Sequence, residues 1–282
     1  NNDKITVAQS VALIVTSVIW IGLRIPREVA ELADSDGWIL IITGGLMAFI
    51  GSLVLGILIR RFPEDTFIEY SRKVVGKFPA AFLGIIIAIY FVLATSTVIR
   101  VFAEVICVFM LQKTPGEFIV ISQLLITIYL IRHGIEPTAR IAELLLPILM
   151  IPIFAMYLIA IPKADFTELL PFLNTSFSSM AWGSFSAMLS FSGIEVLLVL
   201  GPYIRRPDKI YWINFASVAS VTIFFLFIVV VVFAAIGVEN TKYLIWPGMN
   251  IVRQIMAPGQ IFEKLDALAL ALWTIAAFTA AN

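Results

Sequence analysis

The chain has 282 residues, of which 61% are hydrophobic and 13% are charged, and its 19 basic and 19 acidic residues balance. Soluble domains are about 45–50% apolar and about 25% charged, so this composition excludes an ordinary soluble domain and indicates a polytopic membrane protein. The zero net charge gives no sign of a nucleic-acid partner. Cys107 and His133 are the only cysteine and histidine, so we expect no disulfide, no metal centre and no cofactor.

Eight apolar segments are long enough for membrane helices, which need about 20 residues. In chain order they cover residues 6–33, 38–60, 79–111, 117–132, 138–161, 180–202, 211–237 and 262–282. They predict an all-α polytopic membrane protein with a single transmembrane domain over residues 1–282. Basic residues are concentrated in the loops on the side of the N-terminus, so the positive-inside rule predicts a cytosolic N-terminus.

Two of the connecting segments contain mixed apolar and charged residues. Residues 63–77 read PEDTFIEYSRKVVGK, which predicts a short amphipathic helix on the membrane surface. Residues 239–259 read ENTKYLIWPGMNIVRQIMAPG, which predicts a loop with one short interfacial helix.

The first and sixth segments are interrupted near their middles. In the first, Gly22 tolerates unwound backbone, and Pro26 lacks an N–H and clashes with the preceding turn. In the sixth, residues 190–193 are mostly small or flexible. A glycine and a proline alone are compatible with a simple kink. Two breaks five helices apart favour an inverted-repeat transporter fold, in which the irregular backbone lines a cavity and helix ends face anionic ligand groups.

Four of the ionisable residues in the apolar segments are candidates for a functional role, because charges there are costly and often functional. Arg100 and Glu104, four residues apart, could form a structural ion pair or a functional one. Glu195 could cap free N–H groups after the second break or act as a protonatable site. Arg24 could extend toward the interface or reach an anionic ligand. All four are candidates for charge coupling.

Five stretches of the sequence resemble, in the same order, the spore germination permease family, the B subunit of nutrient germinant receptors. They are IPREVAELADSDGWILIITGGLMAFIGSLVLGILIRRFPEDTFIEYSRKVVGK, IRVFAEVI, RHGIEPTARIAELLLPI, FSGIEVLLVLGPYIRRP and FEKLDALALALWTIAAF. The resemblance implies the fold of the amino acid–polyamine–organocation (APC) superfamily, with about ten helices in two inverted repeats. The first repeat is expected at about 1–161 and the second at about 180–282, with eight of the ten helices present.

The resemblance also implies a function. Family members are membrane subunits in the inner membrane of bacterial endospores that sense a small nutrient, often an amino acid. They signal to a larger membrane subunit and a lipoprotein subunit. No enzymatic activity is expected. A proton-coupled amino-acid transporter remains an alternative, as does a water or ion conduit lined by Ser190, Ser192 and Glu195.

The resemblance finally implies a ligand pocket between the two interruptions. Its expected residues are Trp20, Ile21, Gly22 and Leu23 of the first helix, Phe191, Ser192, Gly193 and Ile194 of the sixth, Tyr90, Ala94 and Val98 of the third, and Trp273 and Thr274 of the eighth. Relatives usually carry a glycine-x-glycine pattern where this chain has Ile19 and Ile21, with Gly22 shifted by one. The side chains crowd the position of a carboxylate, so the ligand is expected to be smaller, apolar, or bound through Arg24.

Overall fold

The computed structural model describes residues 4–109 and 111–255. Within these ranges the regular elements are helices, apart from an isolated β-bridge between Ile5 and Ile204. The all-α prediction is therefore confirmed for the described part of the chain. The predicted eighth membrane segment, 262–282, lies outside the described residues, together with Trp273 and Thr274.

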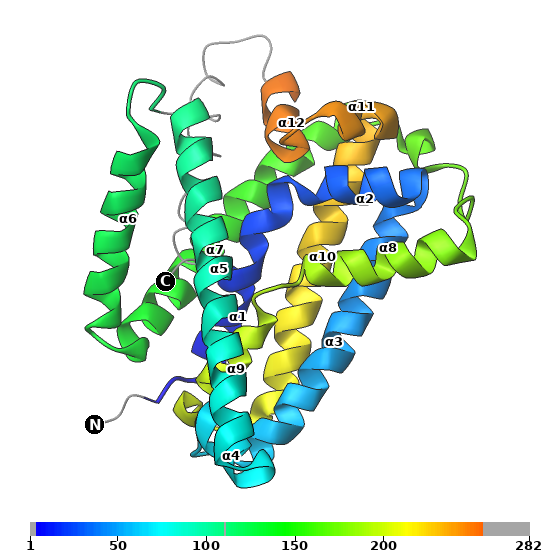
Figure 1. The fold of residues 1–282 in the computed structure, drawn as a ribbon. Helices are drawn as coiled ribbons and strands as arrows, with labels where there is room; N and C mark the ends of the chain where they lie inside the picture. The colour runs from blue at the N-terminus through cyan, green and yellow to red at the C-terminus, as the bar shows by residue number, and fades with distance from the viewer. Residues whose placement is uncertain (1–3, 110, 256–282) are drawn as a thin grey trace.

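Long helices occupy the predicted apolar segments (Figure 1). They are α3 (Gly37–Arg61), α5 (Lys77–Phe109), α6 (Gly116–Ile131), α7 (Ile135–Ala160) and α10 (Ile210–Ile236). By length and composition, four helical runs in the described residues can cross a membrane, or five when one bent pair is counted as a single span. The 16 residues of α6 extend only about 24 Å, less than a hydrocarbon core of about 30 Å.

The predicted amphipathic segment forms α4 (Phe67–Val75), between α3 and α5. A capping box starts it, because the Thr66 backbone N–H donates to the Glu69 carboxylate at 2.7 Å and the Thr66 hydroxyl caps the first turn. For the connection after α10 the sequence predicted a loop with one short helix, but the structure has two short helices there. These are α11 (Val238–Tyr243) and α12 (Pro247–Ile255).

The first predicted interruption is present in the structure. α1 (Val7–Ile19) gives way to a 3-10 turn at Trp20–Leu23, and α2 (Ile25–Ala33) then runs in a different direction across the molecule (Figure 1). The predicted role of Pro26 needs a correction. Pro26 lies in the first turn of α2, where its missing N–H has no intrahelical partner to lose, so it starts a new helix rather than kinking an old one.

The second interruption separates α8 (Phe177–Leu189) from a 3-10 turn at Ile194–Val196 and the short α9 (Leu197–Leu200), with a bend of 50°. Gly193 has φ +120° at this bend, a conformation that favours glycine. A Cβ atom on Gly193 would lie 2.6 Å from the carbonyl oxygen of Ser17 in α1. The two interrupted segments therefore touch. The backbone of α1 at Ser17 lies directly against the backbone of Gly193, which has no side chain to separate them.

The core is built around α1 and α10. α10 packs against α3 and α1, while α1 also packs against α7. In the most apolar stretch of α10, 56% of the residues are buried, whereas in that of α5 only 11% are buried. α5 therefore lies at the periphery and exposes an apolar face that is suited to lipid. Gly44 of α3 allows a close approach to α8, since a Cβ there would lie 2.9 Å from the Met188 nitrogen.

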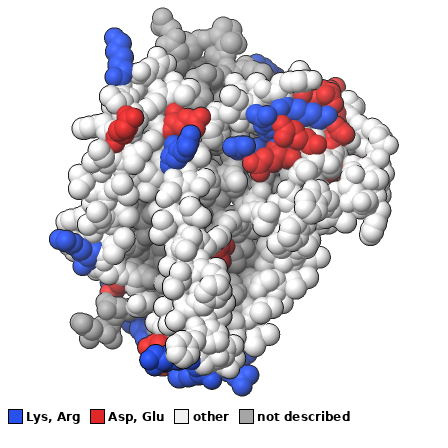
Figure 2. Space-filling view, in the orientation of Figure 1, with Lys and Arg blue, Asp and Glu red and all other residues white. Residues whose placement is uncertain are grey.

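Charged side chains gather mainly near the two ends of the long helices, and the face between them is mostly uncharged (Figure 2). Near one end, Lys4 donates to the carbonyl of Pro202 at 2.8 Å, and Ile5 exchanges backbone hydrogen bonds with Tyr203 and Arg205. The segment before α1 is thus fixed beside the segment after α9. No pattern in the sequence predicted that these two distant segments would pair.

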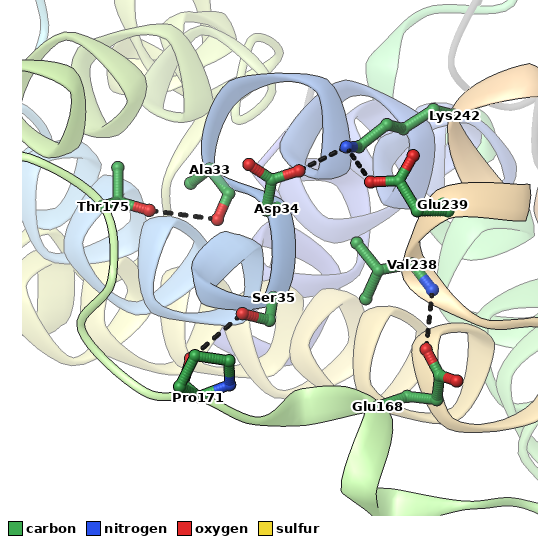
Figure 3. A network of polar contacts seen from close by, with 9 residues as sticks. All are labelled: Ala33, Asp34, Ser35, Glu168, Pro171, Thr175, Val238, Glu239 and Lys242. Atoms are coloured by element: carbon green, nitrogen blue, oxygen red, sulfur yellow. Dashed lines mark hydrogen bonds and ion pairs between the residues drawn. The ribbon is translucent and has the colours of Figure 1, made fainter.

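A polar network ties three segments together at the opposite end (Figure 3). Lys242 of α11 donates to Asp34 and, at 2.6 Å, to Glu239. The Thr175 hydroxyl donates to the carbonyl of Ala33 at 3.1 Å, so the connection between α7 and α8 joins the same network. Hydrogen bonds to Asp34 and then to Glu239 raise the pKa of the Lys242 ammonium above its ordinary value, because both carboxylates favour the charged form.

Candidate functional site: a cavity beside the two interruptions

A cavity of about 780 Å³ lies beside the contact between the two interrupted segments. Its walls come from α1 and the 3-10 turn that follows it, α5, the end of α6, the start of α7 and residues 192–203. The lining residues are Leu13, Ser17, Trp20, Tyr90, Phe91, Leu93, Ala94, Thr95, Thr97, Val98, Ile131, Gly134, Ile135, Thr138, Ser192, Gly193, Glu195, Val196, Val199, Leu200 and Tyr203. A cavity of this volume falls within the range of small-molecule sites, about 300–1,000 Å³.

Six of the predicted ligand-binding residues line this cavity, and so does one of the predicted charge-coupling residues. The six are Trp20, Tyr90, Ala94, Val98, Ser192 and Gly193, and the charged one is Glu195. Tyr90, Ala94 and Val98 follow each other at intervals of four residues along α5, so they share one face of that helix.

The structure does not bring the other described pocket residues to the cavity. Gly22 faces α10, where a Cβ would lie 3.1 Å from the Phe224 ring. Phe191 is buried and packs edge-to-face on Phe225, with ring centroids 5.5 Å apart. Ile21, Leu23 and Ile194 are likewise absent from its walls, the last two being buried in the core. A 3-10 turn has three residues per turn, so Ile21 and Gly22 point in directions different from that of Trp20.

A hydrogen-bonded cluster occupies one wall of the cavity. The Tyr90 and Ser192 hydroxyl oxygens lie 2.8 Å apart, and both hydroxyls donate to Oε1 of Glu195, the Ser192 contact being 2.9 Å. The backbone N–H of Gly193 donates to Oε2 of the same carboxylate at 2.8 Å. Glu195 therefore joins α5 to the second interruption through side chains 105 residues apart in sequence.

The other predicted charge-coupling residues lie away from the cavity. Arg24 is half exposed and pairs with Glu28, with Nε 3.2 Å from Oε1, as expected for charges four residues apart on a helix. Arg24 is not among the residues that line the cavity, so its predicted contact with a ligand there has no geometric support. Arg100 and Glu104 are both exposed, and no ion pair joins them, so the predicted structural pair is wrong.

Several lining residues were missed by the sequence prediction. Ser17 lies one turn before Trp20 and shares its helix face with Leu13, so helical spacing could have identified it. Gly134, Thr138 and Tyr203 come from segments that meet only in the folded chain, and no sequence pattern pointed to them. In the described residues, no group of three or more His, Cys, Asp or Glu side chains is arranged to hold a metal ion.

Comparison with known proteins identifies the family. Residues 4–281 match the family model described as spore germination protein. The chain is 31% identical over 278 residues to spore germination protein YndE of Bacillus subtilis (strain 168), covering 98% of this chain and 77% of that protein. It is 25% identical over 279 residues to spore germination protein B2 of the same organism, covering 99% and 76%.

A relative from a second species extends the comparison. Spore germination protein GerQB of Bacillus cereus is 24% identical over 263 residues, covering 93% of this chain and 72% of that protein. The similarity extends along nearly the whole chain in each case. The chain therefore belongs to the spore germination permease family.

Proposed function

We propose that this chain is the membrane subunit of a nutrient germinant receptor, and that it binds a small nutrient, such as an amino acid, in the cavity beside the two interruptions. Membership of the spore germination family supports a role in germination. The nutrient site rests on one observation above the others. Two interrupted helical segments touch at Gly193 and Ser17, next to a cavity of about 780 Å³.

The physical basis of the proposal is that irregular backbone inside a membrane is stable only where it is buried in protein or lines a cavity. The turn after α8 satisfies both conditions, because Phe191 is buried while Ser192 and Gly193 face the cavity. A ligand that fits one arrangement of the two segments better than another would shift the population toward that arrangement. Partner subunits would sense the shift.

The rest of the expected architecture belongs to the same proposal. It includes an APC-type fold with inverted repeats at about 1–161 and 180–282, and a location in the inner membrane of the spore. The partners are a larger membrane subunit and a lipoprotein subunit. We place the N-terminus in the cytosol because the α4 end of the molecule carries most of its basic residues, among them Arg60, Arg61, Arg72 and Lys73.

Narrowing the cavity should weaken the nutrient response without affecting assembly. Ala94→Phe places a ring in the cavity wall, and we expect germination to need at least about tenfold more nutrient, because each 1.4 kcal/mol of lost binding is a factor of ten. Ala88→Phe is the matched control, since Ala88 lies on the same helix but is exposed and outside the cavity. The measurement is the nutrient dose response of spores with equal amounts of each variant in the membrane. An unchanged response of the Ala94→Phe spores would place the nutrient site elsewhere.

A proton-coupled amino-acid transporter is the second candidate, and the carboxylate of Glu195 on the cavity wall favours it. Uptake of labelled amino acid into proteoliposomes, with and without a pH gradient, distinguishes the two functions. Accumulation that depends on the gradient would support transport, and its absence alongside a nutrient response would support the receptor.

The water or ion conduit has weaker support. Its predicted lining residue Ser190 is buried, and its hydroxyl lies 3.5 Å from Glu28 rather than in the cavity. Ser192 and Glu195 do line the cavity. Osmotic swelling of liposomes that contain the protein tests this function, and Ser192→Leu should slow swelling if a water path passes here.

A further inference from the structure

The described walls of the cavity carry an unusual balance of charge. Among the residues that line it, Glu195 is the only acidic side chain, and lysine, arginine and histidine are absent. A ligand entering from water must exchange its hydration for contacts with this wall. A negatively charged ligand group would meet a carboxylate without a basic partner, whereas a positively charged group would meet its counter-charge.

The hydrogen-bond donors next to Glu195 are already used. The Gly193 N–H, which sits at the second interruption, donates to Oε2, and the Tyr90 and Ser192 hydroxyls donate to Oε1. In transporters of inverted-repeat folds, N–H groups at such interruptions bind the carboxylate of the substrate. Here the carboxylate of the protein's own Glu195 takes that place.

Around Glu195 the wall offers a ligand mainly acceptors, whereas the hydroxyls of Thr95, Thr138 and Tyr203 elsewhere in the lining can donate or accept. A carboxylate accepts at about four positions, and three are occupied. The hydroxyl oxygens of Tyr90 and Ser192 also keep lone pairs. Farther along the wall, the Ser17 hydroxyl donates to the carbonyl of Leu13 at 2.8 Å, so it too presents an acceptor. A protonated amine has three donors and no acceptor, which is the complement of this arrangement.

The aromatic residues of the cavity suit the same ligand class. Trp20, Tyr90, Phe91 and Tyr203 line it, and the remaining lining residues are mostly aliphatic. Aromatic faces attract cations, and aliphatic walls accept an apolar side chain. From these observations together we infer that the cavity selects small apolar amines, with Glu195 as the counter-charge of the ammonium group, and that a ligand carboxylate is not required.

This inference rests on the proposed nutrient site and specifies its ligand class. Three probes with one side chain test it: L-leucinamide keeps the amine and lacks the carboxylate, N-acetyl-L-leucine keeps the carboxylate and lacks the amine, and L-leucine has both. Their affinities are measured from the rise in melting temperature of the full chain in detergent, because a ligand of the folded state raises its stability. We expect L-leucinamide to bind at least tenfold more tightly than N-acetyl-L-leucine.

The variant Glu195→Gln removes the charge and keeps the shape and an accepting oxygen. It should lower the affinity for L-leucinamide at least tenfold. The affinity for N-acetyl-L-leucine should stay unchanged or increase. Glu117→Gln is the matched control, because Glu117 is exposed at the start of α6, outside the cavity. If Glu195→Gln fails to fold, Tyr90→Phe, which removes one donor to Glu195, replaces it and should change the affinity ratio of the two probes.

Three results would overturn the inference. They are equal binding of the amide and the N-acetyl probe, unchanged amide binding by Glu195→Gln, and no binding of any probe. The germination response of Ala94→Phe spores separates this failure from failure of the proposed function. If the Ala94→Phe spores lose the nutrient response but the chain does not prefer L-leucinamide over N-acetyl-L-leucine, the nutrient site stands and only the ligand class is refuted. If the Ala94→Phe spores respond normally, the site itself is refuted.

Discussion

Replacing Gly193 with alanine is expected to destabilise the folded chain by about 3 kcal/mol or more. Gly193 has φ +120°, a conformation that costs residues with a side chain about 1–3 kcal/mol. The new methyl group would also lie 2.6 Å from the Ser17 carbonyl oxygen and 3.0 Å from a methyl group of Val18. Overpacking of this kind costs about 1–3 kcal/mol more. Thermal unfolding in detergent should show a loss of roughly 6–12 °C, at about 2–4 °C per kcal/mol for a chain of this size.

Gly76 provides a control that separates backbone strain from the clash. It has φ +88°, but a Cβ there would have no neighbour within 4 Å. Gly76→Ala should therefore lose only the stability that the backbone strain costs, about 1–3 kcal/mol. Equal losses for the two variants would show that the interrupted segments do not touch at Gly193.

The second large effect is expected at Asp36, which is fully buried between α2 and α3. Its two carboxylate oxygens accept the backbone N–H groups of Leu173 at 2.7 Å and Thr175 at 2.9 Å. Leu173 has φ +55°, so this carboxylate stabilises a strained connection between α7 and α8. Asp36→Ala removes two hydrogen bonds to a charged group, each worth about 1.5–3 kcal/mol, so we expect a loss of about 3 kcal/mol.

Hydrogen exchange provides the specific measurement for Asp36. The amides of Leu173 and Thr175 should exchange faster in Asp36→Ala, and Asp36→Asn, which keeps one accepting oxygen, should lose about half as much stability. Asp208→Ala is the control for loss of an exposed aspartate and should stay within about 0.5 kcal/mol of the original chain. Unchanged exchange at both amides would show that Asp36 does not hold this connection.

The sequence was sufficient to predict the helical class and the positions of both interruptions. Apolar runs bounded by charges predict helices, and glycine with proline or serine predicts where they break. The face of α5 toward the cavity was also predictable, since Tyr90, Ala94 and Val98 repeat at helical spacing and all three line it. These features depend on residues close together in the chain.

The parts that were not predictable depend on tertiary geometry. Gly22 was expected at the ligand, but the 3-10 turn directs it at α10. Arg100 and Glu104 have the spacing of an ion pair, yet both remain exposed on a peripheral helix and do not meet. Glu195 was expected either to cap backbone N–H groups or to titrate. It does accept the Gly193 N–H, while its contact with Tyr90 joins segments that no local pattern relates.

The most direct test of the account is protection of the cavity by the nutrient. In a Cys107→Ser background, Ala94→Cys should react with a water-soluble maleimide, because Ala94 lines the cavity. A nutrient that triggers germination, at ten times its Kd, leaves about one-eleventh of the sites free and should slow the reaction about elevenfold. The same nutrient should not change the reactivity of Glu117→Cys, because Glu117 is exposed at the start of α6 and lies outside the cavity. An unchanged reaction rate at position 94 would contradict the claim that the nutrient binds in this cavity.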